Sequence, residues 1–208
     1  MQSADDMIRP VEPEEIPILA QLQLEALPGS LPNELGRRFL ETYYRVLLPD
    51  PAFFCDVWVD AGRLVAFNAY ASDAAGAFGR ALHAHAAALG LAALAGVLAR
   101  PTRVAVLLRI LRSLAPGYRE VAGDVPAEIL SVAVLPAYRG AAIGSRLIER
   151  ALQVLERAGA ERIKVITKTA AQDPQVNRFF AGHGFRRIDA MRRYGNERNV
   201  HVRTVGGG

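Results

Sequence analysis

A glycine-containing stretch between a strand-like run and a periodic helix is the part of the sequence best suited to holding an anion. The stretch reads YRGAAIGS, from Tyr138 to Ser145, and contains Gly140 and Gly144. A helix beginning there would present its first backbone N–H groups without intrahelical partners, at the positive end of the helix dipole. The junction is therefore suited to phosphate, although the same glycines also fit a tight turn or close packing alone.

The elements that flank this turn are predicted by their hydrophobic patterns. The run AEILSVAVL predicts a strand over 127–135, and apolar residues every four positions predict a helix over 143–158 that ends at Gly159. The β-branched run ERIKVITKT predicts a second strand over 162–168. A short helix over 174–183 and a terminal hairpin follow, so the turn lies in a strand–helix–strand–helix unit.

The N-terminal half of the chain adds a short strand, two helices and a hairpin. The segment DAG at 60–62 separates two β-rich runs and is a strong hairpin signal. The 208 residues suffice for one well-buried domain, whereas two would be cramped. We therefore expect a single domain over 1–208.

The segment from about 73 to 117 is alanine- and leucine-rich and shows no strand-like alternation. It predicts a helical insertion of two or more helices, with a break at Arg100-Pro101. The 19 positions from Ala81 to Ala99 carry no formal charge, which is long enough for a membrane span, but alanine, glycine and histidine insert poorly. The composition favours a packed helix over a spanning one. We expect the insertion to cover the substrate side of the sheet or to form a homodimer contact, in a protein that stays soluble without detergent.

Two further motifs give the sequence a family likeness. The run VAVLPAYRGAAIGSRLIERAL resembles the acetyl-coenzyme A motif of the GNAT N-acetyltransferase superfamily, with Arg139, Ala142 and Gly144 at its defining positions. The later run NRFFAGHGF resembles a second segment of that family, from Asn177 to Phe185. The resemblance implies an α+β fold with a mixed, mostly antiparallel central sheet and helices on both faces. It also implies a cofactor between the two splayed parallel strands 127–135 and 162–168.

The resemblance further implies which residues bind acetyl-coenzyme A. Two of them depart from the family pattern: Ala142 replaces the usual glycine, and Phe180 replaces a tyrosine that lies near the coenzyme sulfur and often protonates it. Ala142 costs little if its φ is helical and more if φ is positive. The implied cofactor-binding residues are Val132, Ala133, Val134, Arg139, Gly140, Ala141, Ala142, Ile143, Gly144, Ser145, Asn177 and Phe180.

The activity that the resemblance implies is transfer of an acyl group, most often acetyl, from coenzyme A to a primary amine of a small molecule or peptide. Glu128 is the predicted general base, by its match to the catalytic glutamate of histone-type members; the alternative is an exposed strand-end carboxylate. A backbone N–H near Val132 to Val134 would meet the oxyanion. Two other interpretations stay open: a non-catalytic module that senses acyl-coenzyme A, and a membrane-surface or partner-binding protein acting through the 73–117 insertion.

The composition of the chain narrows the classes of function that remain. The net charge of +4 comes with scattered arginine pairs and no aromatic platform, which favours a solvated surface over a nucleic-acid interface. Cys55 is the single cysteine, so no internal disulfide can form, and a reducing, cytoplasmic setting is expected. No zinc-type spacing of cysteine and histidine is present, and no metal is expected.

Overall fold

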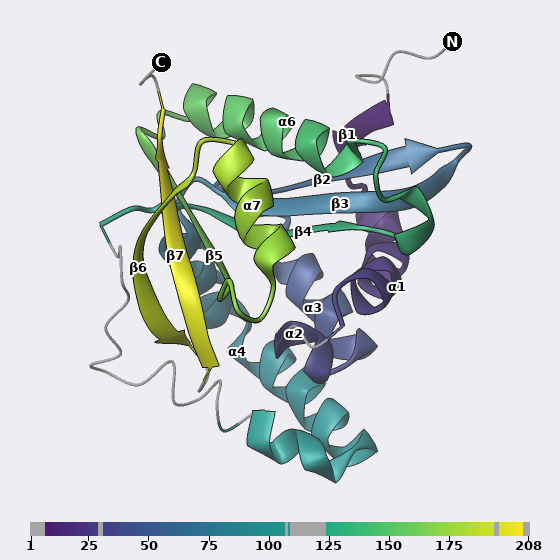
Figure 1. Cartoon of the computed structure of the whole chain (residues 1–208). Coiled ribbons are helices and arrows are strands. Elements are labelled where there is room, and N and C mark those ends of the chain that lie inside the picture. Colours follow the sequence, from purple (N-terminus) through teal and green to yellow (C-terminus); the bar gives the residue numbers. More distant parts are fainter. Residues whose placement is uncertain (1–6, 29–30, 107, 109–123, 194–195, 206–208) are drawn as a thin grey trace.

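The structure of the chain is a computed structural model that describes residues 7–28, 31–106, 108, 124–193 and 196–205 (Figure 1). Seven strands form one sheet in the order β1-β2-β3-β4-β5-β7-β6. The strands are β1 (Ile8–Pro10), β2 (Phe53–Asp60), β3 (Arg63–Ala71), β4 (Ala127–Val134), β5 (Arg162–Lys168), β6 (Arg186–Arg193) and β7 (Asn196–Thr204). Of the pairs between these described strands, only β4 with β5 is parallel.

Helices cover both faces of the sheet, which confirms the predicted fold class. The α-helices are α1 (Ile16–Ala26), α2 (Leu31–Glu34), α3 (Arg37–Leu47), α4 (Ala74–Ala99), α6 (Ile143–Arg157) and α7 (Pro174–Gly182). Short 3-10 helices are η2 (Pro13–Glu15), η3 (Pro101–Arg103) and η4 (Pro136–Tyr138). In Figure 1, α6 lies on one face of the sheet, and α1, α3 and α4 lie on the other.

The two faces of the sheet are built by the alternation of side chains along the strands. On β3, the Asn68 side chain donates to the Leu147 carbonyl of α6 over 3.1 Å, so even-numbered β3 residues face α6. The apolar side of α6 is the one its sequence predicts, because its buried residues follow a helical period. These residues are Ile143, Leu147, Ile148, Ala151, Leu152 and Leu155. Phe180 and Phe185 join the same core cluster as Ile148 and Leu152, which places α7 on the α6 side.

A bulge in β4 precedes the point where the two parallel strands separate. The pairing of β3 with β4 passes from Ala69↔Ser131 to Tyr70↔Ile129, so Leu130 is an extra residue. The parallel pairing of β4 with β5 ends at Ile129↔Val165, although the two strands continue to Val134 and Lys168. The strands therefore diverge toward their carboxyl ends, as the family resemblance implies.

Helix α4, the main described part of the insertion, is packed on one side only. As predicted, a break separates α4, which ends at Ala99, from η3, which begins at Pro101; residues 107 and 109–117 of the insertion lie outside the described part. Close packing occurs at Gly96, where an added Cβ would stand 2.3 Å from the Leu35 carbonyl oxygen. The other side of the helix is open. Among the described helices, α4 alone has the length and apolarity to cross a membrane. Its most apolar 18-residue window has a mean hydropathy of 1.7, and 17% of that window is buried in the protein.

Candidate active site

The turn between β4 and α6 presents backbone donors at the end of a strand. Helix α6 has no side-chain cap within the described chain, and the Arg146 N–H reaches the Ala142 carbonyl over 3.1 Å. The N–H groups of Ile143, Gly144 and Ser145 precede that bond, so they have no intrahelical acceptor. They point out of the helix start together with its partial positive charge, which suits a phosphate oxygen.

The glycines of the turn keep this space open. A Cβ on Gly140, whose φ is +86°, would meet no atom within 4 Å. A Cβ on Gly144 would lie 3.6 Å from the Phe179 ring and 3.7 Å from Val134. Gly144 therefore faces the gap between the end of β4 and α7. The free donors and the small residues together fit a pyrophosphate group, and Gly140 to Ser145 are the residues that would hold it.

The φ of Ala142 is positive rather than helical, which is the costlier of the two possibilities that the sequence left open. Its φ is +57° and its ψ is 10°, in the left-handed region at the N-cap of α6. The methyl group disfavours this conformation by about 1–2 kcal/mol. The family's glycine would be unstrained at this position, so the departure at Ala142 is a local cost to stability.

Ala142→Gly is expected to raise the free energy of unfolding by about 0.5–1 kcal/mol, because relief of strain exceeds the added freedom of the unfolded chain. The affinity for acetyl-coenzyme A should stay the same or increase. Ala61→Gly is the matched control, since Ala61 also has a positive φ, of 47°, but lies in the β2–β3 hairpin. Urea denaturation and calorimetry should show that both variants gain stability while only Ala142→Gly can affect coenzyme binding. A less stable Ala142→Gly protein would contradict this assignment.

Arg139 connects the turn to the N-terminal helix. Its Nε donates to the Val134 carbonyl over 3.1 Å, and a second guanidinium nitrogen reaches the Ala26 carbonyl of α1 over 3.4 Å. Both bonds run to protein carbonyls, so in this conformation the guanidinium fixes the turn. A direct contact between Arg139 and the coenzyme stays a prediction.

The backbone of β4 supplies donors to the divergent gap. The Leu135 N–H donates to Val65 of β3 over 2.9 Å, so alternation turns the N–H groups of Val132 and Val134 away from β3, toward the side that β5 has left. The Ala133 N–H points toward β3. Of the three residues predicted for the oxyanion, Val132 and Val134 therefore have the suitable orientation.

Asn177 holds the first turn of α7 against the end of β5. Its Nδ2 donates to the carbonyls of Lys168 and Asp173, over 2.9 and 2.8 Å. Its Oδ1 accepts from Asn199 Nδ2 over 2.8 Å and lies 3.1 Å from His201 Nε2. The side chain is engaged with the protein, which makes it a positioning residue for α7; its predicted contact with coenzyme A is untested.

The structure places Phe180 in the core. It is 3% exposed and packs edge-on against Phe179 and Phe185, and its contact with coenzyme A stays a prediction. The half-buried Phe179 is the ring beside Gly144. Sequence reasoning missed it because two phenylalanines are adjacent and the motif alone assigns the second to the coenzyme. The rotation of α7 about its axis determines which of the two rings lies beside Gly144, because neighbouring residues on a helix point about 100° apart.

Glu128 is buried beside a lysine. It stands one residue into β4, is 3% exposed, and its Oε2 lies 3.7 Å from Lys164 Nζ on β5. Glu128 pairs with Ala71 and so projects from the face opposite α6. The interpretation as an exposed strand-end carboxylate is therefore wrong. The role of general base stays a prediction, and the charge pair with Lys164 is a structural role that the sequence did not indicate.

His201 is a buried titratable group beneath α7. It is 4% exposed, and its Nε2 lies 3.2 Å from Thr167 Oγ1 and 3.1 Å from Asn177 Oδ1. Burial lowers its pKa below the ordinary value, and the positive charge of Arg187 lowers it further. The neutral ring, with its proton on Nε2, suits the Asn177 acceptor.

The lowered pKa of His201 predicts how stability depends on pH. Below the ordinary histidine pKa of about 6.5, the unfolded chain takes up a proton that the folded protein resists. The contribution of the neutral His201 to the free energy of unfolding is thus complete above about pH 6.5, the pKa in the unfolded chain, and is lost as the pH falls from there toward the lower pKa of the folded protein. Urea unfolding from pH 8 to pH 5.5 should show a smaller acid loss in His201→Gln than in the wild type. Parallel losses in the two proteins would contradict the prediction.

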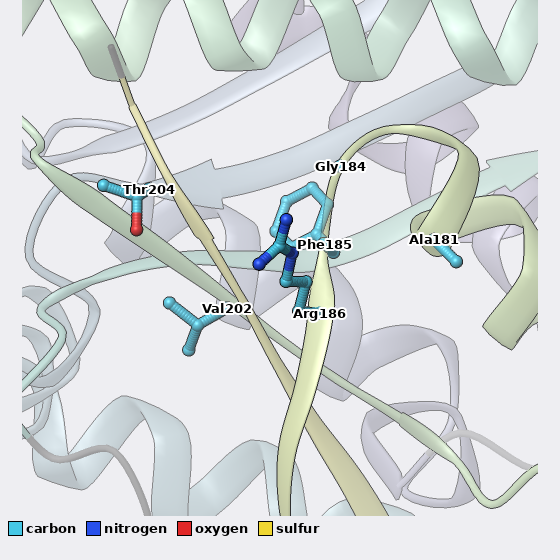
Figure 2. Close-up of a pocket in the computed structure, with 6 residues that line it drawn as sticks. All are labelled: Ala181, Gly184, Phe185, Arg186, Val202 and Thr204. Atoms are coloured by element: carbon cyan, nitrogen blue, oxygen red, sulfur yellow. The ribbon is translucent and has the colours of Figure 1, made fainter. Parts of the chain in front are cut away.

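A pocket of about 490 Å³ lies apart from these groups. It is formed at the carboxyl end of α7 and on the β6–β7 hairpin, and Figure 2 shows its lining residues Ala181, Gly184, Phe185, Arg186, Val202 and Thr204. None of the residues predicted for coenzyme A or for catalysis lines it. We therefore assign this pocket no part in the chemistry.

Comparison with known proteins agrees with the geometry of the turn. Residues 114–185 match the sequence model of the acetyltransferase (GNAT) family. The match covers about a third of the chain. It includes β4, the turn, α6, β5 and α7, while its residues 114–123 lie outside the described part of the structure. No curated protein matches the whole sequence significantly.

Solved structures of GNAT proteins share the fold over nearly the whole chain. The ribosomal-protein-S18-alanine N-acetyltransferase from Escherichia coli superposes with a TM-score of 0.57 at 14% identity, over 97% of this chain and 94% of that one. Aminoglycoside 6'-acetyltransferase type Ii gives 0.56 at 14%, over 95% and 96%. PaiA N-acetyltransferase from Thermoplasma acidophilum, solved with coenzyme A, gives 0.54 at 11%, over 95% and 97%. At these identities the likeness establishes the GNAT fold and leaves the acceptor open.

Proposed function

We propose that this protein is an N-acetyltransferase that transfers an acetyl group from acetyl-coenzyme A to a primary amine of a small molecule or peptide. The observation that carries the proposal is the divergence of β4 from β5 beside an uncapped helix start. The junction between β4 and α6 thereby offers two sets of backbone N–H donors. Those at the start of α6 suit a pyrophosphate, and those at the end of β4 suit a thioester carbonyl. The GNAT match over the same elements supports the same interpretation.

The chain's own groups have distinct tasks in this proposal. The N–H groups from Ile143 to Ser145 bind phosphate oxygens, and Gly144 and Phe179 border the space between them and β4. The N–H groups of Val132 and Val134 stabilise negative charge that develops on the carbonyl oxygen. Phe180 has no proton to donate, so it cannot serve as the general acid. A thiol with a pKa of about 8.5 can depart as thiolate, so the reaction does not require a protonating tyrosine.

The chemistry at the amine needs a proton acceptor. A protonated amine has no free electron pair for attack on the thioester carbon, so its proton must leave before the new C–N bond forms. The electron pair of the broken C–S bond then goes to the coenzyme sulfur. Glu128 is the proposed destination of the amine proton, through intervening water.

The test is a screen for release of coenzyme A thiol. Purified protein with acetyl-coenzyme A should release thiol in the presence of one class among simple amines, aminoglycosides, polyamines and peptide N-termini, with an acetylated product detected by mass spectrometry. Aminoglycosides and protein N-termini enter the panel because structures with the same fold are named for acting on them. Tight coenzyme binding with no thiol release across the panel would favour the acyl-coenzyme A sensor instead.

A further inference from the structure

The second half of α4 carries a stripe of exposed leucines. Leu91, Leu94 and Leu98 are 68%, 49% and 74% exposed. Their spacing places them on one face of the helix, opposite the buried Ala93 and Gly96 that pack toward Leu35. We call these three residues the α4 leucine stripe. Large aliphatic side chains with this exposure on one helix face are a sign of an interaction surface.

The stripe lies at an extremity of the molecule. Figure 1 shows the second half of α4, with the segment that follows it, extending away from the sheet on the side opposite α6. Beyond the Pro101 break, Val104 and Leu108 are also 45% and 48% exposed. This end of the protein can therefore approach a flat surface without obstruction from the sheet.

The segment of sequence that contains the stripe carries side-chain charge of one sign. From Ala74 to Arg119 the sequence contains six arginines and no aspartate or glutamate. The whole chain has 25 basic and 21 acidic residues, so outside this segment acids outnumber bases. Among the described arginines, Arg100 stands exposed immediately after α4, two residues from Leu98. The positive excess of the sequence thus falls in the segment that contains the exposed leucines, and Arg100 is its exposed, described member beside them.

We infer that the second half of α4 binds the surface of an anionic phospholipid bilayer. The leucine stripe would enter the boundary between headgroups and acyl chains while the arginines contact phosphates, as in interfacial amphipathic helices. A second copy of the chain fits this surface less well, because a two-fold contact would bring the same acid-free segments together.

The helix cannot span the bilayer while the fold is intact. Its first half is anchored in the protein, where Ala77 and Ala81 are buried and Arg80 pairs with Asp50 over 2.8 Å. His85, with a φ of −129°, interrupts the helix between the two halves. The inference is therefore peripheral attachment, with the helix packed on the protein rather than spanning the bilayer.

The test is sedimentation with lipid vesicles. The wild-type protein should bind vesicles of phosphatidylcholine with phosphatidylglycerol, bind phosphatidylcholine alone at least about tenfold more weakly, and dissociate at high salt. The triple variant Leu91→Gln, Leu94→Gln, Leu98→Gln should lose about tenfold or more in the partition coefficient. Its far-ultraviolet circular dichroism and melting temperature should match the wild type, because the changed side chains are exposed.

Matched controls are available elsewhere on the surface. Ile18 on α1 and Ile188 on β6 are 53% and 51% exposed, so Ile18→Gln with Ile188→Gln removes exposed aliphatic surface away from α4, and the loss is compared per side chain. Arg100→Gln should weaken binding to the anionic vesicles, whereas Arg63→Gln in the β2–β3 hairpin should not. Absence of wild-type binding to anionic vesicles, or equal losses in the triple and control variants, would overturn the inference. A leucine-dependent dimer in sedimentation velocity, without vesicle binding, would overturn it in favour of a second copy.

Discussion

Gly144→Val is expected to raise the dissociation constant for acetyl-coenzyme A by about 100-fold, which corresponds to roughly 2.7 kcal/mol. The first carbon of a side chain at this position fits in ordinary contact, 3.6 Å from Phe179 and 3.7 Å from Val134. The two methyl groups of valine extend beyond it into the gap between β4 and α7. They would occupy the space beside the phosphate donors and leave the helix itself intact.

A graded series separates obstruction of the gap from loss of stability. Gly144→Ala adds only the tolerated Cβ and should change the affinity little, while Gly79→Val makes the same exchange in α4, where a Cβ meets no atom within 4 Å. Isothermal titration calorimetry measures the acetyl-coenzyme A affinity of the three variants, after circular dichroism has verified that each is folded. Wild-type affinity in a folded Gly144→Val protein would refute the phosphate-binding turn.

The elements around the turn could be predicted because their signals are local. Gly140 and Gly144, the strand before them and the helical period after them lie within about thirty consecutive residues, and a strand–turn–helix unit is determined by such neighbours. Even Ala142 could be identified as a position of interest, although only the structure gives the sign of its φ. Positions within one unit of secondary structure are thus accessible from sequence.

The tertiary contacts of the candidate site were not accessible in this way. Lys164 reaches Glu128 because two parallel strands align their first residues, and that register is a tertiary property. Phe179 lies beside Gly144 while Phe180 is buried, because the rotation of α7 is fixed by packing against Phe185. Packing also exposes the leucines of α4, since its buried side is made of alanine and glycine. An apolar segment in sequence does not reveal which of its faces will find a partner.

Glu128→Gln is expected to lower kcat by about 100-fold or more while acetyl-coenzyme A binding stays near the wild-type value. The amide keeps the size of the carboxylate but cannot accept the amine proton, and activity should recover in part at high pH as solvent removes the proton. Strand geometry adds a constraint. At about 3.3 Å per residue, Glu128 lies roughly 13 Å along β4 from Val132, so the proton must pass through water.

The same substitution has a second effect that must be separated from the first. Without Glu128, the buried ammonium of Lys164 loses the carboxylate 3.7 Å away, and breaking a buried pair costs about 3–5 kcal/mol of stability. The double variant Glu128→Gln, Lys164→Met removes both charges and should regain much of that stability. If Glu128 is the base, kcat per folded molecule stays low in the double variant and normal in Lys164→Met alone. If the pair serves only the fold, the double variant recovers kcat together with its melting temperature, and the base must be sought elsewhere on the face opposite α6.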